Sequence, residues 1–323
     1  MRKLGMIVGL VIALVGAAAL LFGDSVMGEA TIEGDTPFLI PAGSSLSAVA
    51  RDLERAGHIS SADGFLLRAR LFGSSDPIQA GEFSLSSEMS QGDILTLFQD
   101  GDVIRRFVTI PEGMPSILVR ERLMALDLMT GDVAVPPEGS ILPDTYSYER
   151  GQDRAALVEQ MQAAMDLYLA EAWAGRGEAI AVDTMREALI LASIVEKETG
   201  TPAERGTVAG LYSNRLEIGM MLQADPTIIY PITQGKPLGR RIRQSEIAAV
   251  NDYNTYTRLG LPEGPITNPG RESITAVLQP EDHDYLFMVA DGTGGHEFNE
   301  TLSDHNAAVG RWFQIRRERG ELE

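Results

Sequence analysis

The chain has 323 residues, 44% of them hydrophobic and 23% charged, which is the composition of an ordinary globular protein. Its net charge of −19 argues against a nucleic-acid partner, because a polyanion would be repelled, and we expect none. The sequence has no cysteine, which excludes disulfides and thiolate catalysis, and its four histidines are scattered, so we expect neither a metal nor a cofactor.

The first predicted element is an uncharged segment, residues 4–22, which follows Arg2 and Lys3. Nineteen helical residues at about 1.5 Å each span roughly 28 Å, close to the hydrocarbon thickness of a bilayer. The basic residues before this segment and the acidic residues after it predict a cytoplasmic tail at 1–3 and an extracytoplasmic body. We therefore expect a single-pass membrane anchor, with a cleavable signal peptide as the alternative.

A small mixed unit is predicted after an acidic tether at residues 23–35. It begins with a short strand at Phe38, continues with helices at 46–56 and 62–71, and ends with a strand at 80–85. This strand–helix–helix–strand layout within residues 36–107 resembles a LysM-like module, a class that binds glycans containing N-acetylglucosamine. A generic small α+β adaptor has the same layout and is the alternative.

A second, mainly helical unit is predicted for residues 108–323, because the turn sequence at 40–43 recurs at 110–113. We predict a proline-rich loop at 134–146, a strand at 285–290 and long polar loops over 223–270. Helices are predicted at 153–174, 184–199, 205–219, 273–278 and 301–317. The expected fold class is therefore α+β, with a single N-terminal transmembrane helix, a small LysM-like module and a mainly helical catalytic domain.

The predicted helix at 184–199 ends in Glu196-Lys197-Glu198 after a strongly apolar run. At about 100° per residue, the large apolar side chains centre on the direction of Glu198, whereas Glu196 points about 160° away. We therefore expect Glu198 at the apolar end of the helix, beside a cleft, and Glu196 on or near a solvated face. Burial would raise the pKa of Glu198, as a general acid requires. Ion pairing with a buried arginine, Arg205 or Arg215, is the alternative.

Polar and aromatic side chains are concentrated in the loops predicted after this helix, at 223–230, 252–256 and 260–270. Sugar-binding sites use such groups, because aromatic faces stack on pyranose rings and amides or phenols bond hydroxyl and acetamido groups. A well-ordered surface loop held by prolines and Asx turns is the alternative.

Four stretches carry a family resemblance: LASIVEKET (191–199), NRLEIGMMLQADPTIIY (214–230), YNTYTRLGLPEGPITNPG (253–270) and YLFMVADGTGGHEFNETLSDHN (285–306). Together they resemble the MltG (YceG-like) family of membrane-anchored endolytic murein transglycosylases. Members cleave the β-1,4 bond between N-acetylmuramic acid and N-acetylglucosamine in nascent glycan strands and leave a 1,6-anhydro end. The resemblance implies peptidoglycan strands as substrate, a penicillin-binding synthase as partner, and the bacterial cytoplasmic (inner) membrane, facing the periplasm, as location.

The resemblance also implies site residues. The catalytic glutamate of the family falls on Glu198, which protonates the glycosidic oxygen and then accepts the proton of the sugar's C6 hydroxyl. Positions that match the family motifs are candidates for the glycan cleft: Gln223, Asp225, Tyr230, Asn254 and Tyr256. For Asp225, orienting the acetamide and capping a turn remain equal alternatives.

This chain departs from the family at residues 138–146, where EGSILPDTY lacks two aromatic residues of the family's EGFLFPDTY. Any stacking by those two rings is therefore in doubt here. His296 and His305 match the last motif and are interpreted as structural. Two other functions stay open: a two-carboxylate muramidase that uses Asp225 with Glu198, and a non-catalytic glycan-binding scaffold.

Overall fold

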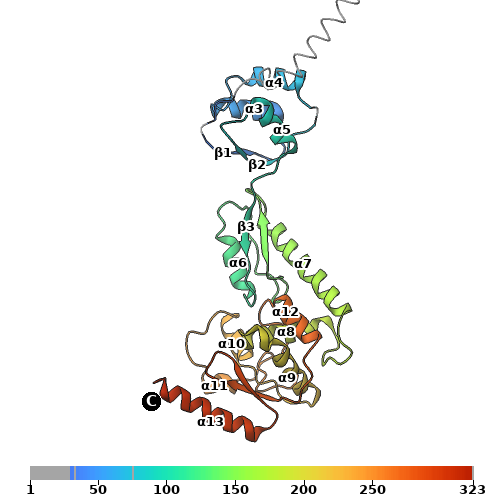
Figure 1. Cartoon of the computed structure of the whole chain (residues 1–323), viewed down its shortest axis with the longest axis vertical. Helices are drawn as coiled ribbons and strands as arrows, with labels where there is room; N and C mark the ends of the chain where they lie inside the picture. Colours follow the sequence, from blue (N-terminus) through green and yellow to red (C-terminus); the bar gives the residue numbers. More distant parts are fainter. Residues whose placement is uncertain (1–29, 33, 75, 322–323) are drawn as a thin grey trace, which may run out of the picture. The chain divides into compact units, whose positions relative to one another are not determined.

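The computed structural model describes residues 30–32, 34–74 and 76–321, and the chain divides into two compact units (Figure 1). The first unit runs to Arg106 and also holds Tyr148–Gly151, and the second holds the rest of the chain. The predicted anchor at 4–22 lies outside the described residues. No helix within the described ranges has the length and apolar character needed to cross a membrane.

The first unit contains the predicted strand–helix–helix–strand order and one further helix. The strands β1 (Thr36–Ile40) and β2 (Gly81–Leu85) pair antiparallel, with Phe38 opposite Phe83. Serine side chains cap the N-termini of all three helices and so fix where each begins: α3 (Leu46–Arg55), α4 (Ala62–Phe72) and α5 (Gln91–Asp100). The helix α5 was not predicted, although its start carries a reciprocal capping box between Ser90 and Asp93.

Aromatic packing closes the core of this unit. The ring of Phe98 on α5 lies 5.6 Å from that of Phe38 and 5.2 Å from that of Phe83, so the helix covers the sheet. The side chain of Glu82 is only 2% exposed and forms ion pairs with Arg106 and Arg150. Burial by itself would raise the pKa of Glu82, but hydrogen bonds from these two arginines lower it.

The second unit is mainly helical, with two small sheets, and the α+β class is therefore confirmed. One sheet pairs β3 (Arg106–Thr109) with β4 (Thr145–Tyr148), and the other pairs β5 (Phe287–Ala290) with β6 (His296–Asn299). The helices are α6 (Ser116–Met124), α7 (Arg154–Ala174), α8 (Met185–Glu198), α9 (Arg205–Glu217), α10 (Pro226–Thr233), α11 (Gln244–Ile247), α12 (Arg271–Leu278) and α13 (Leu302–Glu318).

The helix α8 is central in this unit and contacts α7, α9, α10 and α12 (Figure 1). Every residue from Ile190 to Val195 is buried, as the apolar run predicts. Thr184 caps the helix with Glu187 in a capping box, and Glu198 is its last residue.

The prediction of long loops over 223–270 was wrong in two places, because α10 and α11 lie there. Pro226 occupies the first turn of α10, where its fixed φ is compatible with a helix. Pro231 lies inside α10, and a proline at such a position argues against a helix when only the sequence is known. The predicted loop at 134–146 also overlaps the start of β4.

Candidate active site

The carboxyl group of Glu198 is buried at the C-terminal end of α8, although the residue as a whole is partly exposed. Its Oε1 atom has no hydrogen-bond partner among the residues that the structure describes. Burial raises the pKa of Glu198 to about 8, and the negative charge of Asp225 adds to this effect. Arg215 and a hydrogen bond from Tyr212 act in the opposite direction. The carboxyl is therefore largely protonated near neutral pH.

The helix α9 supplies the buried wall beside Glu198. Tyr212 is 2% exposed, and burial raises the pKa of its phenol well above the usual value. The guanidinium of Arg215 donates to the carbonyls of Leu286 (2.7 Å) and Leu222 (2.5 Å). Tyr212 was not predicted for the site, and Arg215 was named only as an alternative ion-pair partner of Glu198, although the two residues stand three positions apart on one predicted helix and so share a face.

Ion pairing does not explain the burial of Glu198. Arg215 bonds carbonyl oxygens and forms no ion pair in the described part of the chain. Arg205 pairs with Glu112 (3.1 Å) and Glu272 instead. Glu198 is therefore a buried acid that forms no ion pair within the described residues, although the charge of Arg215 acts on it from a greater distance.

Asp225 and Tyr256 lie on the exposed side of the site. The Tyr256 hydroxyl donates to Oδ1 of Asp225 at 2.6 Å, and the charges of both Asp225 and Glu198 help to raise the pKa of Tyr256 after burial. Asp225 stands at the N-cap of α10, but its side chain makes no capping hydrogen bond. The carboxylate is thus aimed at the site and not at the end of its own helix.

Gln223 has a left-handed backbone, with φ of 50°, which is uncommon for a residue with a side chain. Its N–H donates to the Thr255 carbonyl (3.1 Å), and the N–H of Ala224 donates to Thr255 Oγ1 (3.0 Å). These bonds tie the two predicted site segments, 223–230 and 252–256, to each other. The side chain of Gln223 is exposed.

Asn254 and Tyr230 are placed differently from the other candidates. Asn254 is fully buried, donates to the carbonyls of Ile247 (2.9 Å) and Ala249 (2.6 Å), and accepts from the N–H of Tyr256 (3.0 Å). Its amide therefore holds the loop together. Tyr230 stacks at a tilt on another tyrosine ring, hydrogen-bonds with Glu138, and lines a neighbouring cavity.

The prediction that Glu196 lies on or near a solvated face was wrong. Its side chain is only 7% exposed, and Oε2 accepts hydrogen bonds from the Gly270 N–H (3.0 Å) and the Ser273 hydroxyl (2.6 Å). The helix α12 contacts α8 on this side. The carboxylate of Glu196 thus joins the end of α8 to the start of α12.

The two histidines of the last family motif make contacts outside the group formed by Glu198, Asp225 and Tyr256. Nδ1 of His296 lies 2.8 Å from Oε2 of Glu204, which also accepts from the hydroxyl of Thr199, the residue that ends α8. The ring of His305 stacks on Phe287 at 5.2 Å between centroids.

The two positions that lack the family's aromatic residues have other uses here. Leu142 is buried in the core of the helical unit. The Ser140 hydroxyl donates to the Pro137 carbonyl at 2.7 Å. A ring at position 142 would pack in the core, so its loss does not remove a stacking surface.

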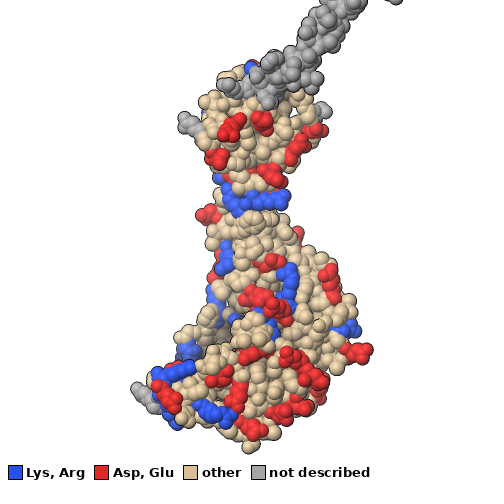
Figure 2. Space-filling view, viewed as in Figure 1, with Lys and Arg blue, Asp and Glu red and all other residues tan. Residues whose placement is uncertain are grey.

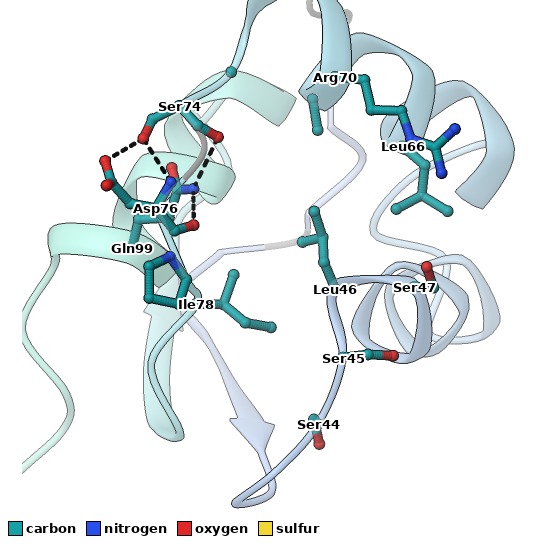
Figure 3. Close-up of a pocket in the computed structure, with 13 residues that line it drawn as sticks. Ser44, Ser45, Leu46, Ser47, Leu66, Arg70, Ser74, Asp76, Ile78 and Gln99 are labelled. Atoms are coloured by element: carbon teal, nitrogen blue, oxygen red, sulfur yellow. Dashed lines mark hydrogen bonds between the residues drawn. The ribbon is translucent and has the colours of Figure 1, made fainter.

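The first unit has a cavity of its own, of about 640 Å³ (Figure 3). The turn before α3 and the segment between α4 and β2 form its two sides, and Gln99 braces the second side by donating to the carbonyls of Ser74 and Asp76. Serine hydroxyls and Arg70 surround apolar contacts from Leu46, Leu66 and Ile78 (Figure 3). Polar groups around an apolar floor suit a sugar.

Known proteins resemble this chain over most of its length. It is 27% identical to the endolytic murein transglycosylase of Bacillus subtilis, over 95% of this chain and 93% of that protein. It is 29% identical to the endolytic murein transglycosylase of Streptococcus pneumoniae over 83% of this chain, but spans 57% of that longer protein.

A solved structure of a YceG-like protein from Listeria monocytogenes matches with a TM-score of 0.52 and 27% identity, covering 85% of this chain and 99% of that one. The profile of the YceG-like family matches residues 38–311, which is most of the chain. The family resemblance of the four motifs is thereby confirmed, and the chain belongs to the YceG-like family.

Proposed function

We propose that this chain is an endolytic murein transglycosylase that cleaves the bond between N-acetylmuramic acid and N-acetylglucosamine within peptidoglycan strands. The name shared by the relatives in Bacillus subtilis and Streptococcus pneumoniae supports the class of enzyme. The observation that carries the mechanism is the buried Glu198 carboxyl, with a pKa raised to about 8 and one oxygen without a partner. Such a group is a proton donor at neutral pH.

In the proposed reaction Glu198 gives its proton to the glycosidic oxygen as the bond to muramic acid C1 breaks. Positive charge then develops at C1, close to the carboxylate of Asp225. The C6 hydroxyl of the same sugar attacks C1 and returns its proton to Glu198, so that a 1,6-anhydro ring forms and no water is added. One carboxyl thus serves as acid and then as base.

Asp225 supports a second candidate, a muramidase that adds water. Its carboxylate lies near enough to Glu198 to raise the pKa of that residue, so two carboxyl groups face one site as in a hydrolase. The hydrogen bond from Tyr256 holds Asp225 in place, which also suits the simpler role of steadying the charge at C1 or the acetamido group.

The cavity of the first unit supports a glycan-binding role for the LysM-like module. We assign its serine hydroxyls and Arg70 to sugar hydroxyls or acetamides, and its leucine and isoleucine side chains to the pyranose face. From the sequence we also propose that residues 4–22 anchor the chain in the cytoplasmic membrane, beside a penicillin-binding synthase.

The test is digestion of purified glycan strands in ¹⁸O-labelled water, followed by mass spectrometry of the new ends. Transglycosylation predicts unlabelled 1,6-anhydro ends, and hydrolysis predicts reducing ends that carry the label. Glu198→Gln should abolish either product. Ends formed at the wild-type rate by Glu198→Gln would overturn the assignment of the acid, and no cleavage by the wild type would favour the scaffold.

A further inference from the structure

A second cavity of the helical unit, of about 470 Å³, lies beside the candidate active site. Its walls come from the turn before α6, from α10 and from the loop that follows α10. Most of the lining is apolar, including Leu118, Ile229, Leu238 and Ile266, and Tyr230 also lines it. Its volume is within the range of about 300–1,000 Å³ that ligand cavities occupy.

The lysines of the chain distinguish this cavity. The sequence has only three lysines, at 3, 197 and 236, among 27 basic residues. Both lysines that the structure describes, Lys197 and Lys236, line this one cavity, which we call the lysine cavity. Acidic side chains are scattered over the visible face of the same unit (Figure 2), and the chain carries a net charge of −19. Two lysines on one apolar cavity therefore contrast with the net negative charge of the chain.

Of the two lysine charges on this cavity, that of Lys197 is free of an ion pair among the described residues. Lys197 is exposed and forms no ion pair with any described residue. Lys236 pairs at 2.5 Å with Glu121, which is half exposed. The one carboxylate in the lining, Glu112, pairs with Arg205 at 3.1 Å, and Arg205 also pairs with Glu272. The loop beyond Lys236 continues with three arginines up to residue 243 and no acid.

Two pairs of consecutive residues join the lysine cavity to the active site. Lys197 lines the cavity and precedes Glu198, while Pro226 lines it and follows Asp225. Because consecutive Cα atoms are about 3.8 Å apart, the two sites are separated by little more than the end of α8 and the start of α10. The lysine cavity is therefore a direct neighbour, through the backbone, of the site at which the sugar is proposed to bind.

We propose that the lysine cavity binds the peptide carried on the lactyl group of the muramic acid at which the strand is cut. This inference rests on the proposed function. The peptide is acidic and rich in alanine, so its carboxylates match the two ammonium groups and its methyl groups match the apolar wall. The lysine cavity thus makes the enzyme prefer strands that still carry their peptides.

The experiment compares glycan strands before and after an amidase has removed their peptides, using the full chain. The wild type should cleave peptide-bearing strands with kcat/KM at least tenfold higher. Lys197→Gln should lower this ratio about tenfold, as expected for loss of one charge-assisted contact, whereas Lys197→Arg should largely keep it. Arg317→Gln removes an exposed charge on α13 and is the matched control. In this variant the ratio of kcat/KM between the two kinds of strand should not change.

Equal losses on both substrates for Lys197→Gln, or a wild-type ratio near one, would overturn the inference and leave the proposed function intact. A wild type that cleaves neither strand contradicts the proposed function instead. In that case, titration of the protein with a synthetic stem tetrapeptide, followed by NMR, tests peptide binding at the lysine cavity independently of activity. Binding by the wild type that weakens in Lys197→Gln and in Lys236→Gln supports the peptide site, and absence of binding refutes it.

Discussion

Glu198→Gln should make the protein more stable at neutral pH while it removes activity. The carboxyl has a pKa of about 8 in the folded chain against an ordinary value of 4.5. Between these values the folded state binds more protons than the unfolded state, so stability falls as pH rises. Glutamine cannot ionise in either state, so the stability of the variant does not fall with pH for this reason.

The size of the gain follows from the two pKa values. One pKa unit corresponds to about 1.4 kcal/mol. Up to about pH 7 the glutamate ionises in the unfolded chain but not in the folded one. The free energy of unfolding of the wild type is therefore lower by about 3 kcal/mol at about pH 7 than at about pH 4. The difference between variant and wild type should therefore be near zero at about pH 4, rise through neutral pH and level off above pH 8. The same change removes the proposed proton donor and should lower kcat by about 10²–10⁴-fold.

Urea unfolding followed by tryptophan fluorescence measures this difference for the right unit, because both tryptophans, Trp173 and Trp312, lie in the helical unit. Glu196→Gln is the matched control, since that carboxylate accepts hydrogen bonds from Gly270 and Ser273, and its loss should lower stability by about 1–3 kcal/mol. A Glu198→Gln variant that gains no stability between about pH 4 and pH 8 would refute the buried, protonated carboxyl.

Three further changes test the surroundings of the site and the first unit. Asp225→Asn removes a charge that raises the pKa of Glu198, so the alkaline limb of the pH profile of kcat/KM should move to lower pH; a move to higher pH contradicts the geometry. Asn254→Ala removes a buried amide that donates to the Ile247 and Ala249 carbonyls and should lower the stability of the helical unit by about 2–4 kcal/mol in urea unfolding. The stabilising contribution of Glu82 is present above about pH 4.5 and is lost as pH falls, because the hydrogen bonds of two arginines outweigh burial and lower its pKa. Glu82→Gln should therefore flatten the acid unfolding curve of the first unit in circular dichroism.

The orientation of Glu198 was predictable because it depends on local geometry. The apolar residues that define the buried side of α8 lie within two turns of it in the same helix, so a period of about 3.6 residues was sufficient. The same reasoning failed for Glu196, whose donors, Gly270 and Ser273, lie 74 and 77 residues further along the chain. A helical wheel contains no information about which distant element will cover a polar side.

The polar loop residues show the same limit. Asn254 and Tyr256 were equivalent candidates in the sequence, but one is buried against backbone carbonyls and the other reaches Asp225. The amide of Asn254 bonds carbonyls at and just after the end of the short helix α11, and this segment was predicted to be a loop. The sequence therefore did not indicate which of the two polar side chains faces the site. Resemblance to a family identifies such a segment but does not separate ligand contacts from internal supports.

The long sequence separation of these contacts also determines when the acid becomes active during folding. The helix that ends at Glu198 is complete before Asp225, Tyr256 and Gly270 have been synthesised. Until those residues fold against it, the carboxyl is solvated and ionises as an ordinary glutamate. Formation of such non-local contacts is slow compared with formation of the helix. The pKa of Glu198 therefore rises only after nearly the whole helical unit has been synthesised and has folded around this carboxyl.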